Sequence, residues 1–172
     1  MRFSLSALAL ILVAAPAAAA LPTGAKAPDF VTQGALGGKP FKLALAEQLR
    51  HGPVVLYFFP KAFTKGCTLE ARAFSEAMPE FKAAGARVIG MSADDLESLK
   101  KFSIEGCRSA FPVARADNKV IKAYDVAIPG VGLSNRTSYV IARDGRIVMV
   151  HSDMDWKDHV AKSLEAVQAL KR

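Results

Sequence analysis

The sequence predicts an α/β fold in which a central mixed β-sheet is flanked by helices. Three observations lead to this prediction. Two continuous apolar runs, at 54–59 and 87–91, have the composition of strands buried on both faces. Each run is followed by a segment with helical spacing, and such alternation is typical of a partly parallel sheet with helices on both faces. Two further apolar runs flank Asp144-Gly145 and predict a β-hairpin, which adds antiparallel strands.

The segment before the first strand has no clear periodicity. Residues 21–40 are rich in Gly, Pro and Lys, and we expect an extended arm with turns at Gly34 and at Gly37-Gly38. Residues 43–49 predict a short helix that leads into the strand at 54–59.

The segment 68–84 has the spacing of a helix with one apolar face. Pro79 lies inside it, so a kink or an early break is expected there, and Gly85 is a suitable stop. The apolar face is formed by Leu69, Phe74, Ala77, Met78 and Phe81.

After the strand at 87–91, Ser92 and Asp95 resemble an N-cap with an acidic third position, which predicts a helix over 94–105. The complete order matches a thioredoxin-like architecture. The remaining predicted elements are a short strand or turn at 111–113, a short helix at 119–124, hairpin strands at 137–142 and 146–151, and a last helix at 156–170.

The length and composition predict one globular domain, residues 21–172, behind a signal peptide, residues 1–20. A basic start is followed by an uncharged apolar run at 3–15, and Pro16 and four alanines supply a cleavage site after Ala20. An uncleaved membrane anchor is the alternative, but the apolar run is shorter than the ~20 residues that a spanning helix needs. We therefore expect an exported protein, periplasmic or secreted, without stable membrane association after cleavage.

The net charge does not indicate a nucleic-acid-binding protein. The formal charge of +7 falls to +6 when residues 1–20 are removed, because Arg2 is their only charged residue. The basic side chains are scattered along the chain without a dense block, which is typical of a solvated surface.

The chain holds two cysteines, Cys67 and Cys107. In an oxidising compartment, two cysteines form a structural disulfide by default. Cys67, however, stands at a predicted helix start, where unpaired N–H groups and the helix dipole stabilise a thiolate. Thr64 can offer its hydroxyl to the sulfur or to a bound oxygen, and Pro60, which ends the strand, can shield the pocket from water. Such a pocket suits cleavage of an O–O bond, because fixed donors stabilise the charge on the leaving oxygen.

Pro60, Thr64 and Cys67 match the pattern P-x-x-x-T-x-x-C, and the wider segment YFFPKAFTKGCTLEA resembles the bacterioferritin-comigratory, or Q-type, branch of the peroxiredoxins. The resemblance covers nearly all of the chain after residue 20. It includes the segments 24–30, 90–102, 111–112 and 123–126 and the predicted hairpin.

The resemblance implies a thioredoxin-like fold and a thiol-dependent peroxidase that reduces hydrogen peroxide and organic hydroperoxides. Cys67 corresponds to the peroxidatic cysteine, which becomes a sulfenic acid, and Pro60 and Thr64 to pocket residues. Arg136 corresponds to the family's arginine, although by itself it could be a surface residue at a strand end. Glu70 fits the family pattern as a supporting residue that orients Arg136. No cofactor is implied; the partners are a hydroperoxide and a thioredoxin-like or other thiol reductant, and Q-type relatives suggest a monomer.

The sequence departs from many Q-type members at position 72, where Arg72 replaces a resolving cysteine. Cys107 is then the only resolving candidate, and other members of the family place a resolving cysteine in that helix. We expect the two sulfurs to be too far apart in the reduced state, so that both segments must unwind locally, which Gly66 and Gly106 would ease. A static disulfide, an unused Cys107 with an external thiol as resolver, and a spectator thiol are the alternatives.

Three other functions are less consistent with the sequence. An exported thiol-disulfide oxidoreductase would need C-x-x-C at the helix start, but position 70 is Glu. The segment HSDMDWKDH could supply metal ligands from His151, Asp153, Asp155 and His159, but its spacing fits no tight motif. We expect a loop with Asp155 as a helix cap. A non-catalytic protein of the same fold would not need Pro60, Thr64, Cys67 and Arg136 together.

Overall fold

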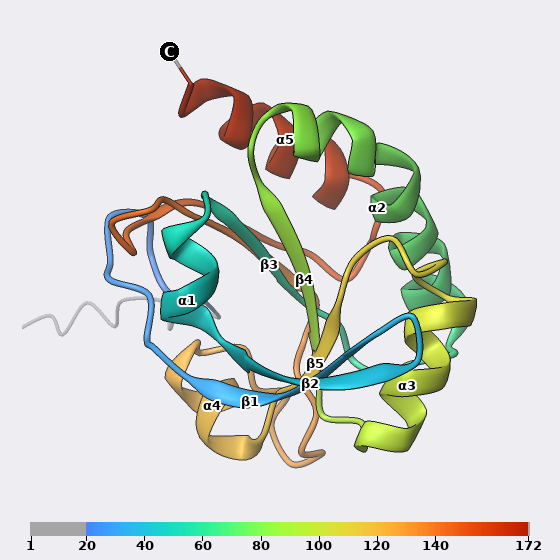
Figure 1. Cartoon of the computed structure of the whole chain (residues 1–172). Coiled ribbons are helices and arrows are strands. Elements are labelled where there is room, and N and C mark those ends of the chain that lie inside the picture. The colour runs from blue at the N-terminus through green and yellow to red at the C-terminus, as the bar shows by residue number, and fades with distance from the viewer. Residues whose placement is uncertain (1–19, 172) are drawn as a thin grey trace, which may run out of the picture.

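A single seven-stranded mixed sheet forms the centre of the molecule in the computed structural model, which describes residues 20–171 (Figure 1). The predicted α/β class with a thioredoxin-like arrangement is confirmed. The strand order is β2-β1-β5-β4-β3-β6-β7. The strands are β1 (Val31–Leu36), β2 (Lys39–Ala44), β3 (Val54–Phe58), β4 (Arg87–Ser92), β5 (Val113–Arg115), β6 (Thr137–Ile141) and β7 (Ile147–Ser152). The helices are α1 (Leu45–Arg50), α2 (Lys65–Ala83), α3 (Leu96–Glu105), α4 (Asn118–Ala123) and α5 (His159–Ala169).

Strand β3 lies near the middle of the sheet and is buried along its whole length. It pairs in parallel with β4 and antiparallel with β6, and the second pairing places Phe58 opposite Thr137. Successive side chains of a strand point to opposite faces, so β3 supplies apolar side chains to both layers. Because Phe58 ends β3 and Thr137 begins β6, the pairing of these strands places the C-terminal end of β3 beside the N-terminal end of β6.

Helices cover both faces of the sheet and create two separate cores (Figure 1). Helices α1 and α4 pack over one face, where Leu56 and Phe58 of β3 contribute to the core. Helices α2, α3 and α5 pack over the other face, where Val55 and Tyr57 of β3 lie. The apolar run that predicted this strand is thus divided between two helical layers.

The N-terminal segment differs from the expected arm, because residues 31–44 form the antiparallel hairpin β1–β2. Gly37 and Gly38 make the turn with positive φ values of 55° and 78°. The turn expected at Gly34 was wrong. Gly34 lies within β1 opposite Ala114 of β5, and a Cβ there would come within 3.0 Å of the Val113 carbonyl oxygen. Glycine is needed at this position for the close approach of two strands.

Helix α2 begins three residues earlier than predicted and does not break at Pro79. It continues to Ala83, and Gly85 follows with a φ of 73°, as expected for a helix stop. The buried side chains of Met78 and Phe81, on either side of the proline, pack in the core, and this burial holds the last turn in place. The earlier start places Cys67 inside the first turn.

The predicted caps of two helices also need correction. Asp95, not Ser92, caps α3, because its side chain accepts a hydrogen bond from the Ser98 N–H, whereas Ser92 ends β4. Helix α5 begins at His159 with Asp158 in the capping position, so Asp155 is not its cap.

Among residues 20–171, no helix has both the length and the apolar character that a membrane-spanning segment requires. The predicted signal peptide falls almost entirely on residues 1–19, which lie outside the described part of the chain.

Candidate active site

Cys67 lies in the first turn of α2, just beyond the C-terminal end of β3. Its side chain is buried, with 2% of the residue's surface exposed, and the thiol is free. Thr64 occupies the capping position with an extended backbone, so the N–H groups of this turn have no partner within the helix. These N–H groups and the positive end of the helix dipole favour an anion at the sulfur.

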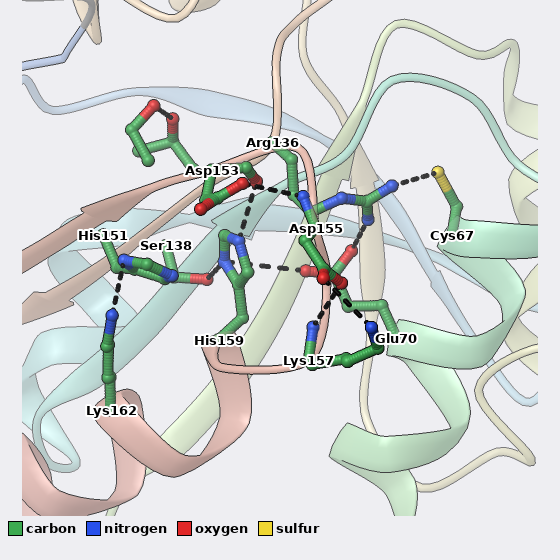
Figure 2. A network of polar contacts seen from close by, with 12 residues as sticks. Cys67, Glu70, Arg136, Ser138, His151, Asp153, Asp155, Lys157, His159 and Lys162 are labelled. Carbon is green, nitrogen blue, oxygen red and sulfur yellow. Dashed lines mark hydrogen bonds and ion pairs between the residues drawn. The ribbon is translucent and has the colours of Figure 1, made fainter.

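The guanidinium of Arg136 points at the Cys67 sulfur (Figure 2). Its Nη2 lies 3.5 Å from Sγ, its Nε donates to the Met154 carbonyl oxygen at 3.0 Å, and its Nη1 donates to Glu70 Oε2. The residue precedes β6, and the pairing of β6 with β3 brings it to the start of α2. All three nitrogens are therefore in use, and the positive charge is fixed beside the thiol.

Glu70 follows Cys67 by three residues and lies on the same face of α2, fully buried. Burial raises the pKa of the Glu70 carboxyl to about 8, and the opposing effect of Arg136 is smaller. Burial acts to lower the pKa of Arg136, but the charges of Glu70 and Cys67 outweigh it and raise that pKa. Arg136 thus stays charged, whereas Glu70 can change its protonation state near neutral pH.

His159 lies next to the Arg136–Glu70 pair, although its sequence context did not assign it to this site. His159 is fully buried, and its Nδ1 lies 2.8 Å from Ser138 Oγ and 3.7 Å from Glu70 Oε1. The sequence contains a signal that could have found it, because His159, Ser163 and Val167 recur every four residues on the buried face of α5. The side chain of a histidine at such a position is expected to face the protein interior rather than solvent.

The segment considered for metal ligands does not converge on a common point. His159 Nε2 contacts the carbonyl oxygen of Asp153, and Asp155 pairs with the neighbouring Lys157 (Figure 2). No cluster of three or more side chains suited to a metal ion occurs within the described part of the chain.

Thr64 and Pro60 precede Cys67 in the chain, and in the described part of the structure the Thr64 hydroxyl is hydrogen-bonded to Lys61 rather than to the Cys67 sulfur. Thr64 is exposed, and its hydroxyl donates to the Lys61 carbonyl oxygen at 2.9 Å. Its oxygen therefore retains lone pairs that can accept a hydrogen bond, but its hydrogen is already used. Pro60 is half-buried between the end of β3 and the loop that leads to Cys67.

A family model described as AhpC/TSA family matches residues 23–150. The chain belongs to this family. A chloroplastic peroxiredoxin Q from Sedum lineare is 34% identical over 136 residues, which cover 78% of this chain and 72% of that protein. The chloroplastic peroxiredoxin Q of Arabidopsis thaliana is 34% identical over 150 residues, which cover 85% and 67% of the two chains.

Solved structures of peroxiredoxins share the fold. The crystal structure of peroxidoxin BcpB from Mycobacterium tuberculosis superimposes with a TM-score of 0.76 at 32% identity, covering 87% of this chain and 98% of that one. AhpC from Mycobacterium tuberculosis gives a TM-score of 0.74 at 22% identity, covering 88% and 94%, and supports the fold alone. The predicted enzyme class, a thiol peroxidase of the oxidoreductases, is confirmed by these relatives, and a resemblance to Q-type peroxiredoxins is confirmed with it.

Cys107 lies immediately after Gly106, the C-cap of α3, and is fully buried as a free thiol. Its carbonyl oxygen accepts a hydrogen bond of 2.8 Å from Ser75 Oγ. Ser75 stands about two turns beyond Cys67, roughly 12 Å along the axis of α2. Burial strongly raises the pKa of the Cys107 thiol, so it is protonated and a poor nucleophile in this conformation.

Proposed function

We propose that Cys67 is the peroxidatic cysteine of a thiol peroxidase that reduces hydrogen peroxide and organic hydroperoxides. The thiolate attacks the terminal oxygen of the hydroperoxide, a S–O bond forms and the O–O bond breaks. The leaving oxygen takes up a proton to become water or an alcohol, and Cys67 becomes a sulfenic acid. The observation that carries this proposal is the buried Cys67 sulfur, 3.5 Å from an Arg136 guanidinium held by two further contacts.

Each neighbour has a role in this proposal. Arg136 stabilises the thiolate and then the charge that develops on the peroxide oxygens. Glu70 orients Arg136 through its Oε2. Thr64 accepts a hydrogen bond from the hydroperoxide O–H, since its own hydrogen is directed to Lys61. Pro60 supplies no N–H and limits the access of water.

We further propose that Cys107 resolves the sulfenic acid. Its sulfur attacks the Cys67 sulfur, water leaves, and an intramolecular disulfide forms, which an external thiol reductant of thioredoxin-like type then reduces. A disulfide requires Cα atoms within about 7 Å. Because Ser75 holds the Cys107 carbonyl far along α2, the first turns of α2 and the segment after α3 must open before the two sulfurs can meet.

The burial of Cys107 also favours a second candidate, a one-cysteine peroxidase. In that case an external thiol attacks the sulfenic acid of Cys67 directly, and Cys107 remains a buried thiol.

One experiment separates these mechanisms. The reduced protein is treated with one equivalent of hydrogen peroxide and analysed by mass spectrometry. We expect a 67–107 disulfide in the wild type and a trapped sulfenic acid at Cys67 in Cys107→Ser. A sulfenic acid in both proteins would favour the one-cysteine mechanism. Oxidation of Cys67 no faster than that of a free thiol would contradict the peroxidase function itself.

We also propose that the protein is exported. Export is supported by the basic start, the apolar run at 3–15 and the four alanines that end at Ala20. An exported enzyme needs a thiol reductant in the same compartment. The mass of the protein isolated from its native cells tests this, because cleavage would leave a chain that begins at Leu21.

A further inference from the structure

Gly66 is the second residue of α2 and stands directly before Cys67, but the backbone at this position does not require a glycine. Its φ is not among the positive values that favour glycine elsewhere in the chain. Within a helix, glycine is less favourable than alanine, because it loses more conformational freedom on folding. The presence of glycine in the turn that carries Cys67 therefore needs an explanation from its surroundings.

The surroundings of Gly66 leave little room for a side chain. A Cβ at this position would lie 3.3 Å from Nη2 of Arg136, closer than the roughly 3.5–4.0 Å of a relaxed contact between heavy atoms. Apart from the helix backbone and the two chain neighbours, the only other atom of the described residues within reach would be Cδ1 of Trp156, at 4.0 Å. A methyl group at position 66 would therefore press on a single group, the guanidinium of Arg136.

This guanidinium is held in place and cannot move aside freely. Only 5% of the Arg136 side chain is exposed, its Nε donates to the Met154 carbonyl oxygen at 3.0 Å, and its Nη1 donates to Glu70 (Figure 2). The carbonyl oxygen of Arg136 accepts a hydrogen bond of 3.2 Å from the Asp153 N–H, which fixes its backbone to the same loop. The Cys67 sulfur, 3.5 Å from Nη2, blocks movement in its own direction. A displaced guanidinium must lengthen its contact with the sulfur or lose one of its hydrogen bonds.

We propose that Gly66 is a positioning residue of the peroxidatic site, because the absence of a side chain there creates the space in which the Arg136 guanidinium lies beside the Cys67 sulfur. The inference rests on the proposed role of Cys67. An N–H···S contact weakens as it lengthens or bends, and the attraction between the two charges falls with distance. Gly66 thus acts through Arg136 and has no contact of its own with the reacting atoms.

This role differs from the ease of unwinding that the sequence suggested for Gly66. Space for the guanidinium matters in the closed, reduced protein, before any peroxide is present. Flexibility of the glycine backbone matters later, when α2 opens so that Cys67 can meet Cys107. The two roles therefore affect different steps and can be measured separately.

The other titratable groups that interact with Arg136 come from α2, β3, α5 and the loop before α5: Glu70, Tyr57, His159 and Asp155. None of their side chains comes within 4 Å of a Cβ at position 66. The substitution Gly66→Ala also adds no charge and removes none. A change in the ionisation of Cys67 in this variant would therefore come from the position of Arg136.

Gly66→Ala should raise the pH midpoint for iodoacetamide alkylation of Cys67 by about half a pH unit, equivalent to roughly threefold in the ionisation constant. The rate is measured against pH by mass spectrometry of the peptide that contains Cys67. The midpoint is the quantity to compare, because the absolute rate also depends on access to the sulfur. Glu80→Ala, at an exposed position near the other end of α2, is the control and should keep the wild-type midpoint.

A double variant tests whether Gly66 acts through Arg136. Arg136→Ala removes the guanidinium and should raise the midpoint further than Gly66→Ala does. In this background Gly66→Ala should have no additional effect, because the group that it displaces is absent. Shifts that add in the double variant, or a wild-type midpoint in Gly66→Ala alone, would overturn the proposal.

A crystal structure of reduced Gly66→Ala provides a second measurement. We expect the distance from Nη2 to the Cys67 sulfur to exceed 3.5 Å, or the bond to Met154 or Glu70 to be lost. An alanine accommodated with all three contacts unchanged would refute the role of Gly66.

The alternative role predicts a different pattern. If glycine served only to ease unwinding, Gly66→Ala would keep the wild-type midpoint and would instead slow formation of the 67–107 disulfide after peroxide is added. Because the alkylation experiment contains no peroxide, the proposal for Gly66 can fail while rapid oxidation of Cys67 still supports the peroxidase function.

Discussion

At the scale of single residues, the environment of Cys67 depends on one guanidinium whose nitrogens each have a different partner. Nε of Arg136 binds the Met154 carbonyl, Nη1 binds Glu70 and Nη2 faces the sulfur. A lysine ammonium is a single point and cannot reproduce this fork. The sequence could name Arg136 only through resemblance to a family, because nothing local distinguishes it from a strand-end surface residue.

Arg136→Lys should therefore slow the oxidation of Cys67 by peroxide by about 100-fold, since removal of one preorganised donor costs about that much. Stopped-flow measurement of the second-order rate constant checks this. Arg72→Lys, at an exposed position on the same helix as Cys67, is the matched control and should react at the wild-type rate. Equal rates in the two variants would show that the guanidinium geometry is unimportant.

At the scale of elements, the C-cap of α3, Gly106, is packed too closely to accept a side chain. A Cβ on Gly106 would overlap the ring of Phe102. That ring also packs against Phe59 and Phe63, with centroid distances of 5.4 and 5.3 Å, and Phe63 belongs to the loop before α2. The segment that carries Cys107 and the loop that leads to Cys67 thus share one aromatic contact.

We expect Gly106→Ala to lower the free energy of unfolding by about 1–3 kcal/mol, the usual cost of overpacking a core. Because the displaced Phe102 loosens the segment after α3, native-state alkylation of Cys107 should also accelerate. Urea denaturation and mass spectrometry measure the two effects. Glu105→Ala, the exposed neighbour, is the control. If alkylation of Cys107 were unchanged while stability fell, opening of this segment would not depend on the Phe102 contact.

The elements that the sequence predicted best are those with a strong local pattern. Strand β3 is apolar along its whole length, β4 and β6 each contain a shorter apolar run, and helices α2 and α3 have one apolar face. The hairpin β1–β2 was missed because its residues are mixed in character and its pairing with β5 is a long-range contact. The break expected at Pro79 did not occur, since core packing outweighs one lost backbone hydrogen bond.

At the scale of the whole molecule, the site is assembled from three elements, two helices that cover the same face of the sheet and the segment that leads into β6. Helix α2 supplies Cys67 and Glu70, the start of β6 supplies Arg136, and α5 supplies His159. Two of these groups have pKa values that burial displaces in opposite senses, so the stability of the entire domain should depend on pH.

The folded-state pKa of Glu70, about 8, exceeds its ordinary value of 4.5, so its contribution to stability is complete below 4.5 and is lost as pH rises towards 8. The folded-state pKa of His159, about 4, lies below its ordinary 6.5, so its contribution is complete above 6.5 and is lost as pH falls towards 4. Between about pH 4.5 and 6.5, the loss of stability from Glu70 and the gain from His159 cancel as pH rises. Above that, Glu70 alone should lower the free energy of unfolding by about 1–2 kcal/mol up to pH 8.

Urea unfolding of the reduced protein at pH 6.5 and pH 8 measures this loss. Glu70→Gln should abolish the difference between the two pH values, because the amide does not titrate. A difference that persists in this variant would mean that another group is responsible.

The sequence alone determined the α/β class, most of the elements and the position of Cys67 behind Pro60 and Thr64, because these features depend on residues adjacent in the chain. Tertiary structure decided the rest. The pairing of β3 with β6 brings Arg136 to the sulfur, and the packing of α5 against α2 places His159 behind Glu70. Burial then sets the protonation of Glu70, His159 and Cys107. Burial and long-range pairing depend on which faces of the elements meet, and no local pattern contains that information.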